Sequence, residues 1–105
     1  MTSTTSQVMA NDGLGLLARH WSCENPVARV LIVHGLGEHS GRYEHVGEYL
    51  VQQGFEVVSF DLRGHGASGG DRVHLESFDE YLDDLEVVAA EIKRDIPLII
   101  YGHSM

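Results

Sequence analysis

Three short apolar runs constrain the fold of this chain more than any other feature of its sequence. They are RVLIVH (29–34), FEVVSF (55–60) and PLIIY (97–101), all rich in β-branched residues and set off by Gly or Pro. Strands that are buried on both faces of a parallel sheet have this composition. We therefore expect three central strands that run parallel.

Segments with helical periodicity separate the three runs. RYEHVGEYLVQQG (42–54) spaces its apolar residues close to a helical period, and Gly54 is placed to end the helix in a left-handed turn. SFDEYLDDLEVVAAEIKR (77–94) has the strongest helical pattern, and Ser77 with Glu80 forms a capping box at its start. The alternation of strands and helices predicts an α/β fold whose helices cross over between parallel strands.

The N-terminal part adds an antiparallel element to this prediction. Asp12 and Gly13 form a hairpin signal between a short strand around Val8 and the mixed apolar run that follows. Residues 1–7 are polar and without periodicity, so we expect them to be disordered. The chain has the length and apolar content of one small unit, which we expect to span residues 8–105.

Composition excludes several kinds of partner. Asp and Glu outnumber Lys and Arg by 16 to 7, for a formal net charge of −9. Such a charge repels the phosphates of nucleic acids and anionic lipid headgroups. The sequence shows no membrane span and no signal peptide, so we expect a cytoplasmic location. Cys23 is the only cysteine, which excludes an internal disulfide and a cysteine-based zinc site.

The loops after the three predicted strands hold most of the unusual residues. Their sequences are HGLGEHSG, DLRGHGASGGDR and GHSM, each glycine-rich and polar. In an open parallel sheet, ligands bind beyond the carboxyl ends of the strands. We therefore expect the functional site at this edge.

The third loop matches most of a nucleophile elbow. Gly102, His103, Ser104 and Met105 occupy four of the five positions of Gly-X-Ser-X-Gly, a tight turn between strand and helix that presents a reactive serine. Gly and Ser also favour ordinary turns, so the motif alone does not separate a nucleophile from a turn residue.

The first loop favours the nucleophile. A serine that attacks an acyl group needs two backbone N–H donors for the oxyanion, one after the nucleophile and one from a loop after an earlier strand. HGLG follows the first apolar run, which places these donors on Leu36 and Met105. His34 and Gly35 alone are better interpreted as a turn, but with Ser104 in the third loop they favour an oxyanion hole.

The second loop contains a pattern typical of a different function. GHGASG (64–69) matches the dinucleotide-binding pattern G-x-G-x-x-G. That pattern should open directly into a helix, whereas GDRVHLE intervenes here, so we interpret the loop as a bend beneath the site. The seven histidines show none of the spacings of known zinc motifs. We expect neither a metal nor an organic cofactor.

Together, HGLGEHSGRY, FDLRGHGASGGDR and YGHSM resemble the corresponding stretches of the monoacylglycerol lipase and lysophospholipase-like branch of the α/β-hydrolases, also called serine aminopeptidase S33-like. The resemblance runs from about Asn11 to Met105. It implies the N-terminal part of an α/β-hydrolase fold that ends at the nucleophile elbow. It also implies that Ser104 attacks the carbonyl of a small-molecule ester or lipid, with Leu36 and Met105 as oxyanion donors, and it allows peripheral membrane contact in the full-length form.

One departure from the family pattern bears on activity. In α/β-hydrolases the Asp or Glu and the His of the triad follow the nucleophile, and only Met105 follows Ser104 here. We therefore expect a truncated chain that is inactive alone. The alternatives that stay open are another serine hydrolase on the same scaffold, such as an esterase, thioesterase or aminopeptidase, and a truncated product without catalytic function.

Overall fold

The computed structural model describes residues 3–35, 38–70 and 79–102. Within these ranges the chain forms a five-stranded sheet with helical segments between strands. In chain order the elements are β1 (Thr4–Met9), β2 (Gly15–Trp21), β3 (Ala28–Val33), the 3₁₀ helix η1 (Ser40–Tyr43), α1 (Glu44–Gln52), β4 (Phe55–Phe60), α2 (Asp79–Ala90) and β5 (Leu98–Gly102).

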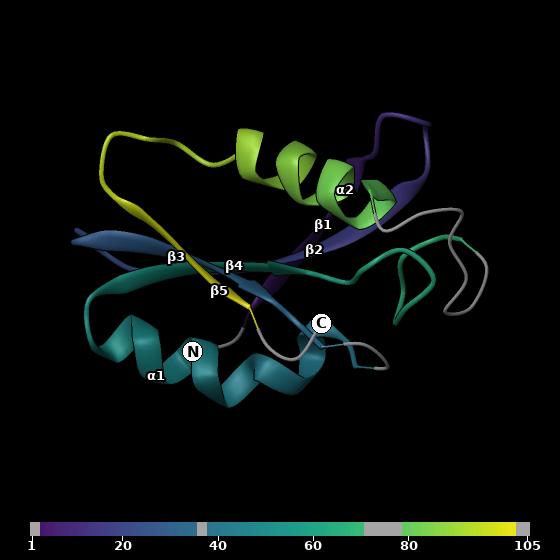
Figure 1. The fold of residues 1–105 in the computed structure, drawn as a ribbon. Helices are drawn as coiled ribbons and strands as arrows, with labels where there is room; N and C mark the ends of the chain where they lie inside the picture. Colours follow the sequence, from purple (N-terminus) through teal and green to yellow (C-terminus); the bar gives the residue numbers. More distant parts are fainter. Residues whose placement is uncertain (1–2, 36–37, 71–78, 103–105) are drawn as a thin grey trace.

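The sheet has the strand order β1-β2-β4-β3-β5. β3 lies parallel to both β4 and β5, whereas β2 is antiparallel to β4 and to β1. Figure 1 shows α1 and α2 on opposite faces of this sheet. The α/β fold with three parallel strands and an antiparallel N-terminal hairpin is therefore confirmed.

The register of the parallel strands aligns the ends from which the three loops depart. Val33, the last residue of β3, is paired with Phe60 at the end of β4 and with Gly102 at the end of β5. The loops after these strands therefore start at one edge of the sheet, as the sequence predicts.

Each face of the sheet has its own apolar core. Leu31 and Ile32 are neighbours on β3 and point to opposite faces, and both are fully buried. The core on the α2 side includes Leu16, Leu31, Phe60, Leu62, Tyr81 and Val88. The core on the α1 side consists of Trp21, Val30, Ile32, Tyr43 and Val57. Burial on both faces explains why the apolar runs are continuous rather than alternating.

The N-terminal strand is longer than the sequence predicts. Residues 4–7, expected to be disordered, belong to β1 and pair with β2 through contacts such as Thr4 with His20. The prediction of disorder is therefore wrong for these residues. β1 lies at the sheet edge and is mostly exposed, so it needs no apolar periodicity, and its threonines suit a strand.

The predicted helices differ from the observed ones mainly at their ends. Gly54 follows α1 with a φ of 94°, which confirms the predicted left-handed turn. α2 ends at Ala90, earlier than predicted. Arg94 lies beyond that end and donates from Nη2 to the Ala89 carbonyl at 2.8 Å, so it supplies a partner to a helix terminus from outside the helix. Ser77 of the predicted capping box lies outside the described residues.

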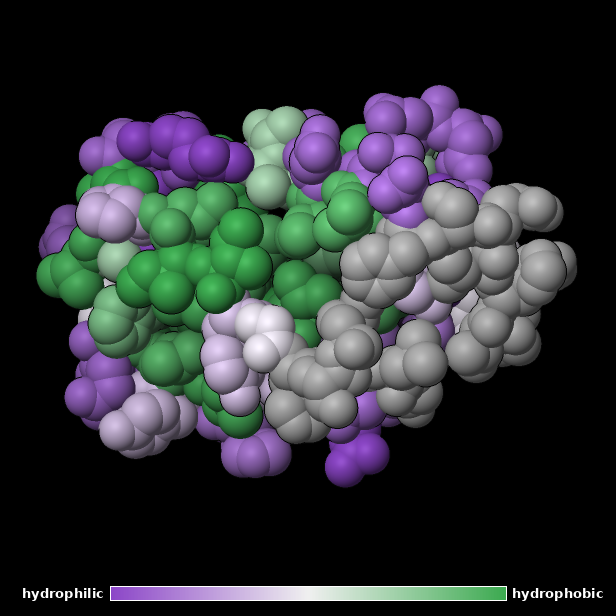
Figure 2. Space-filling view, viewed as in Figure 1, coloured by the Kyte–Doolittle hydropathy of each residue, from purple (hydrophilic) through white to green (hydrophobic). Residues whose placement is uncertain are grey.

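β5 leaves apolar side chains at the surface. Ile99, Ile100 and Tyr101 are 48%, 54% and 47% exposed, respectively. Among the described residues, β3 is the only strand paired with β5. Figure 2 shows a broad apolar area on the face where β5 lies in Figure 1. The third parallel strand is therefore uncovered in the described part of the chain.

A buried ion pair joins the loop after β4 to α2 and to the β1–β2 turn. Arg63 donates to both carboxylate oxygens of Asp84, at 2.7 and 2.8 Å, and Asp84 is 1% exposed. The same guanidinium donates to Asp12 at 2.9 Å and to Glu80 at 3.2 Å. The bidentate bond to Asp84 is the main reason that the pKa of Arg63 lies above its usual value.

Replacing Arg63 with Ala leaves the buried Asp84 carboxylate without its countercharge. We expect the free energy of unfolding to fall by about 3–5 kcal/mol, as measured by urea titration followed by circular dichroism. A double variant, Arg63→Met with Asp84→Leu, removes both charges and should recover most of this loss. Equal destabilisation of the single and double variants would contradict the account.

Candidate active site

The structure describes part of the predicted site. His34 and Gly35 follow β3, and Gly102 ends β5 beside Val33. Leu36, His103, Ser104 and Met105, the other predicted site residues, lie outside the described residues. The structure thus describes the strand ends that precede the predicted nucleophile and the predicted donor Leu36 in the sequence.

The ring of His34 links the loops after β3 and β4. It is fully buried; Nε2 accepts a hydrogen bond from the Leu62 N–H at 2.9 Å, and Nδ1 lies 2.7 Å from the Gly35 carbonyl oxygen. Because Nε2 is an acceptor, we assign the proton of the neutral ring to Nδ1, which donates to Gly35. Burial lowers the pKa of His34, in agreement with a neutral ring.

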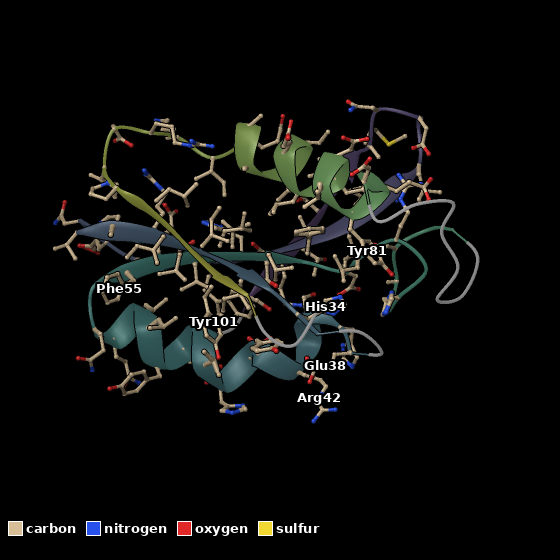
Figure 3. The ribbon with its side chains drawn as sticks, in the orientation of Figure 1. His34, Glu38, Arg42, Phe55, Tyr81 and Tyr101 are labelled. Carbon is tan, nitrogen blue, oxygen red and sulfur yellow. The ribbon has the colours of Figure 1, made fainter. Side chains whose placement is uncertain are left out.

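Glu38 holds the same loop from its other side. Its Oε1 accepts from the Gly35 N–H at 2.8 Å and from the Tyr43 hydroxyl at 2.9 Å, and its own N–H donates to the Gly35 carbonyl at 3.1 Å. Burial, together with the bond to Glu38, raises the pKa of Tyr43 to about 12, so this hydroxyl is a donor at neutral pH. Figure 3 shows His34 near the end of the sheet and Glu38 closer to the helical segment that follows.

Asp61 fixes the start of the loop after β4. This carboxylate is 2% exposed. Its Oδ1 accepts from the N–H and the hydroxyl of Ser40, both at 2.6 Å, and its Oδ2 accepts from the Ala67 N–H at 2.9 Å. Burial alone would raise the pKa of Asp61, but these hydrogen bonds outweigh burial and lower it. Gly66 has a φ of 48° and leaves no room for a Cβ beside this carboxylate, which explains the glycine.

The loop after β4 is a compact bend. Gly64 donates to the Gly69 carbonyl at 2.8 Å, and Ser68 connects the loop to β2 by accepting from the Leu17 N–H at 2.8 Å. Its backbone groups are thus engaged with one another and with the sheet rather than arranged around a phosphate. These contacts agree with the interpretation of GHGASG as a bend beneath the site.

A small hollow lies beside the end of β5. It has a volume of about 220 Å³ and is lined by Glu38, Arg42, Tyr43, His45, Val46 and Tyr101. Charged and aromatic side chains make up most of its lining residues. Glu38 lines the hollow and also accepts from the Gly35 N–H, so the hollow and the Gly35 loop share this residue.

The described residues form neither a metal-binding cluster nor a membrane-spanning helix. No group of three or more His, Cys, Asp or Glu side chains there could hold a metal ion. In the same part of the chain, no helix has the length and apolar character needed to cross a bilayer.

Sequence reasoning missed the support provided by Glu38, Ser40 and Asp61. The available signal was a carboxylate directly after an apolar strand, which is an unfavourable place for a charge unless several donors meet it. The sequence does not reveal those donors, because the whole of α1 and β4 separates Ser40 from Asp61.

Comparisons with known proteins identify relatives along most of the chain. The family model described as "Serine aminopeptidase, S33" matches residues 24–105. A monoacylglycerol lipase of Mycolicibacterium smegmatis is 42% identical over 84 residues, which cover 77% of this chain and 30% of the relative.

Solved structures extend the comparison to the fold. A soluble variant of monoglyceride lipase from Saccharomyces cerevisiae has a TM-score of 0.82 at 25% identity and covers 99% of this chain. A thioesterase domain from the curacin biosynthetic pathway has a TM-score of 0.83 at 30% identity and covers the whole chain. This chain covers 34% and 38% of those two structures, so it spans little more than a third of their length.

The Asp61 network yields a pH-dependent prediction. Asp61→Asn replaces an acceptor oxygen by an NH₂ group that faces other donors, so we expect roughly 1–3 kcal/mol of destabilisation at pH 7. The folded-state pKa lies below the reference value of 3.8. The stabilisation by the carboxylate is therefore complete above that value and is lost as pH falls through the folded-state pKa.

Urea unfolding of both proteins between pH 7 and pH 3 measures this difference. The difference in free energy of unfolding between wild type and Asp61→Asn should be constant above pH 5 and should become smaller as the pH falls toward 3. Asp83→Asn, the same change at an exposed position on α2, is the matched control and should have little effect. A difference in free energy of unfolding that does not change with pH would refute the role of the ionised carboxylate.

Proposed function

Since the chain belongs to the serine aminopeptidase S33 family of α/β-hydrolases, we propose that it supplies the nucleophile and oxyanion hole of a serine ester hydrolase. The substrates we propose are monoacylglycerols or related lipid esters. The observation that carries this proposal is the pairing of Val33 with Gly102. It brings the loop that contains Gly35 and the strand that leads to Ser104 to the same edge of the sheet.

The proposed reaction passes through an acyl-enzyme. The Ser104 hydroxyl passes its proton to a histidine base as its oxygen attacks the ester carbonyl, and the N–H groups of Leu36 and Met105 donate to the oxyanion that forms. Collapse of this intermediate breaks the bond to the alcohol, which leaves with that proton. Water, deprotonated by the same base, then attacks the acyl group, and the fatty acid leaves as Ser104 recovers its proton. No metal or organic cofactor is needed for these steps.

In this family the general base is a histidine that follows the nucleophile in chain order. His34 is unsuited to that role although it directly follows β3, the strand paired with β5. Both of its ring nitrogens are engaged with backbone groups, and the ring is fully buried. We assign His34 to the framework and not to proton transfer.

The proposed substrate of this chain is inferred from the relatives that it resembles. The monoacylglycerol lipase of M. smegmatis and the yeast monoglyceride lipase structure support a monoacylglycerol. The curacin thioesterase domain supports a second candidate, a thioester, because its TM-score is equally high. Attack by a serine on either carbonyl uses the same oxyanion donors, so the framework is compatible with both.

A chimera tests the role of Ser104. In it, this chain replaces the matching stretch of the M. smegmatis monoacylglycerol lipase, and folding is verified by circular dichroism. We expect the chimera to hydrolyse monoacylglycerol and to be labelled by a fluorophosphonate. Ser104→Ala should abolish labelling and reduce kcat at least about a thousandfold.

Two controls sharpen this test. Ser22→Ala changes an exposed serine in the connection between β2 and β3 and should leave both readouts unchanged. Comparison of a monoacylglycerol with the thioester of the same acyl chain separates the two substrate candidates. A folded chimera in which Ser104→Ala retains hydrolysis and labelling would overturn the proposed function.

A further inference from the structure

We propose that a groove beneath the end of α2 binds a single-chain amphiphile whose headgroup is uncharged and carries hydroxyl groups, as in a monoacylglycerol. The groove lies on the α2 face of the sheet, which is opposite to α1 in Figure 1. None of its residues belongs to the predicted active site, so this binding does not depend on the proposed function.

Two neighbouring hollows form this groove. They have volumes of about 310 and 230 Å³. Four lining residues are common to both hollows: His20, Val58, Glu91 and Ile92. The larger hollow alone reaches the lower limit of about 300 Å³ that is typical of small-molecule sites. The shared lining makes the two hollows one continuous groove.

The groove lies apart from the predicted site. Its lining residues come from β1, β2, β4 and β3, which are adjacent in that order in the sheet, and from the end of α2 and the residues that follow it. Arg29 and Glu56 are each the second residue of their strand, so one end of the groove lies where the parallel strands begin. No residue that lines either hollow belongs to β5. The groove is therefore also distinct from the exposed β5 edge.

The end of the groove near β1 is mainly apolar. The apolar residues of that hollow are Val8, Ala18, Val58, Val88 and Ile92. Val58 lies on β4, which has a paired strand on each side, and it packs against the core on the α2 side, yet it is only half-buried. Phe60, the next residue on the same face of β4, is fully buried. The hollow therefore leaves apolar surface that one alkyl chain can cover.

The end of the groove near β3 carries a row of polar side chains. Arg29 and Glu56 are paired in the register of β3 and β4, and Arg29 Nε donates to the Glu56 carboxylate. His20 Nε2 lies 2.7 Å from the same carboxylate. Arg29 Nη1 donates to Asp95 at 2.6 Å. These bonds hold the row in place, so a headgroup meets donors and acceptors that are already ordered.

The charge at this end favours a headgroup without charge. With histidine counted as neutral, the carboxylates there outnumber the cations: Glu56, Glu91 and Asp95 against Arg29 and Lys93. The whole chain has a formal net charge of −9, so a fatty-acid carboxylate is repelled. A hydroxyl group donates to a carboxylate and accepts from a guanidinium or an ammonium. A glycerol headgroup therefore matches both kinds of group.

Titration of the chain with 1-O-decylglycerol tests the proposal. This ether has the proposed headgroup and one alkyl chain, but it has no ester carbonyl and is not consumed by hydrolysis. Isothermal titration calorimetry below its critical micelle concentration measures Kd. We expect saturable binding, and we expect decanoate to bind at least about tenfold more weakly because of its charge. Absence of binding, or equal affinity for decanoate, would overturn the proposal.

Two substitutions of half-buried valines locate the binding site. Val58→Phe adds a ring where the two hollows meet and should weaken binding of the ether at least about tenfold, because the alkyl carbons lose their buried position. Val46→Phe makes the same change in the apolar surface between α1 and β5 and should leave Kd within about threefold. The reverse result would overturn the proposal.

A second pair of variants tests the headgroup preference. Glu91→Gln removes a carboxylate from the groove and should improve the affinity for decanoate relative to the ether at least about threefold. Glu86→Gln makes the same change at an exposed position of α2 that lines neither hollow, so the ratio of the two affinities should stay constant. An unchanged ratio in Glu91→Gln would contradict the role of charge and overturn the proposed headgroup.

Valine methyl resonances give a readout that needs no variant. In ¹³C spectra of the unsubstituted chain, the methyl groups of Val8, Val58 and Val88 should shift as the ether saturates the groove. Those of Val30 and Val46, which line the apolar surface beside β5, should stay in place. Shifts confined to Val30 and Val46 would overturn the proposal even if the variants fail to fold. Ser104→Ala should bind the ether unchanged, so failure of the proposed function is a separate outcome.

Discussion

The buried carboxylate of Asp61 is the interaction on which the arrangement of the site depends. It lies at the end of β4 and accepts from Ser40 at the start of η1 and from Ala67 within the loop after β4. Two segments that are distant in sequence thus converge on one charged group. A buried carboxylate is stable only when such donors meet it, so the position of Asp61 determines where both loops can lie.

The other buried polar groups extend this network toward β3 and α2. The Leu62 N–H, next in sequence to Asp61, donates to His34, and Arg63 pairs with Asp84. Three consecutive residues therefore connect the loop after β4 to the Gly35 loop and to a helix on one face of the sheet. A fully satisfied network of this kind favours one arrangement, since any shift leaves a buried donor or acceptor without a partner.

The sequence predicts the parts of this fold that depend on local composition. Burial on both faces makes β3 and β4 mostly apolar, and the left-handed turn at Gly54 requires a particular residue type. Residues 4–7 escape prediction because an exposed edge strand needs only a partner strand and no apolar pattern. The roles of His34 and Asp61 escape for a related reason: their hydrogen-bond partners are fixed by the sheet register and not by neighbours in sequence.

The neutrality of His34 follows from its burial and from the two hydrogen bonds of its ring. The ring is fully buried, and protonation would turn the acceptor for the Leu62 N–H into a second donor. An unpartnered buried N–H costs about 1–3 kcal/mol, and desolvation of the charged ring adds to that. The neutral ring therefore contributes through geometry: its two hydrogen bonds join the loop after β3 to the loop after β4 without a charge that burial would penalise.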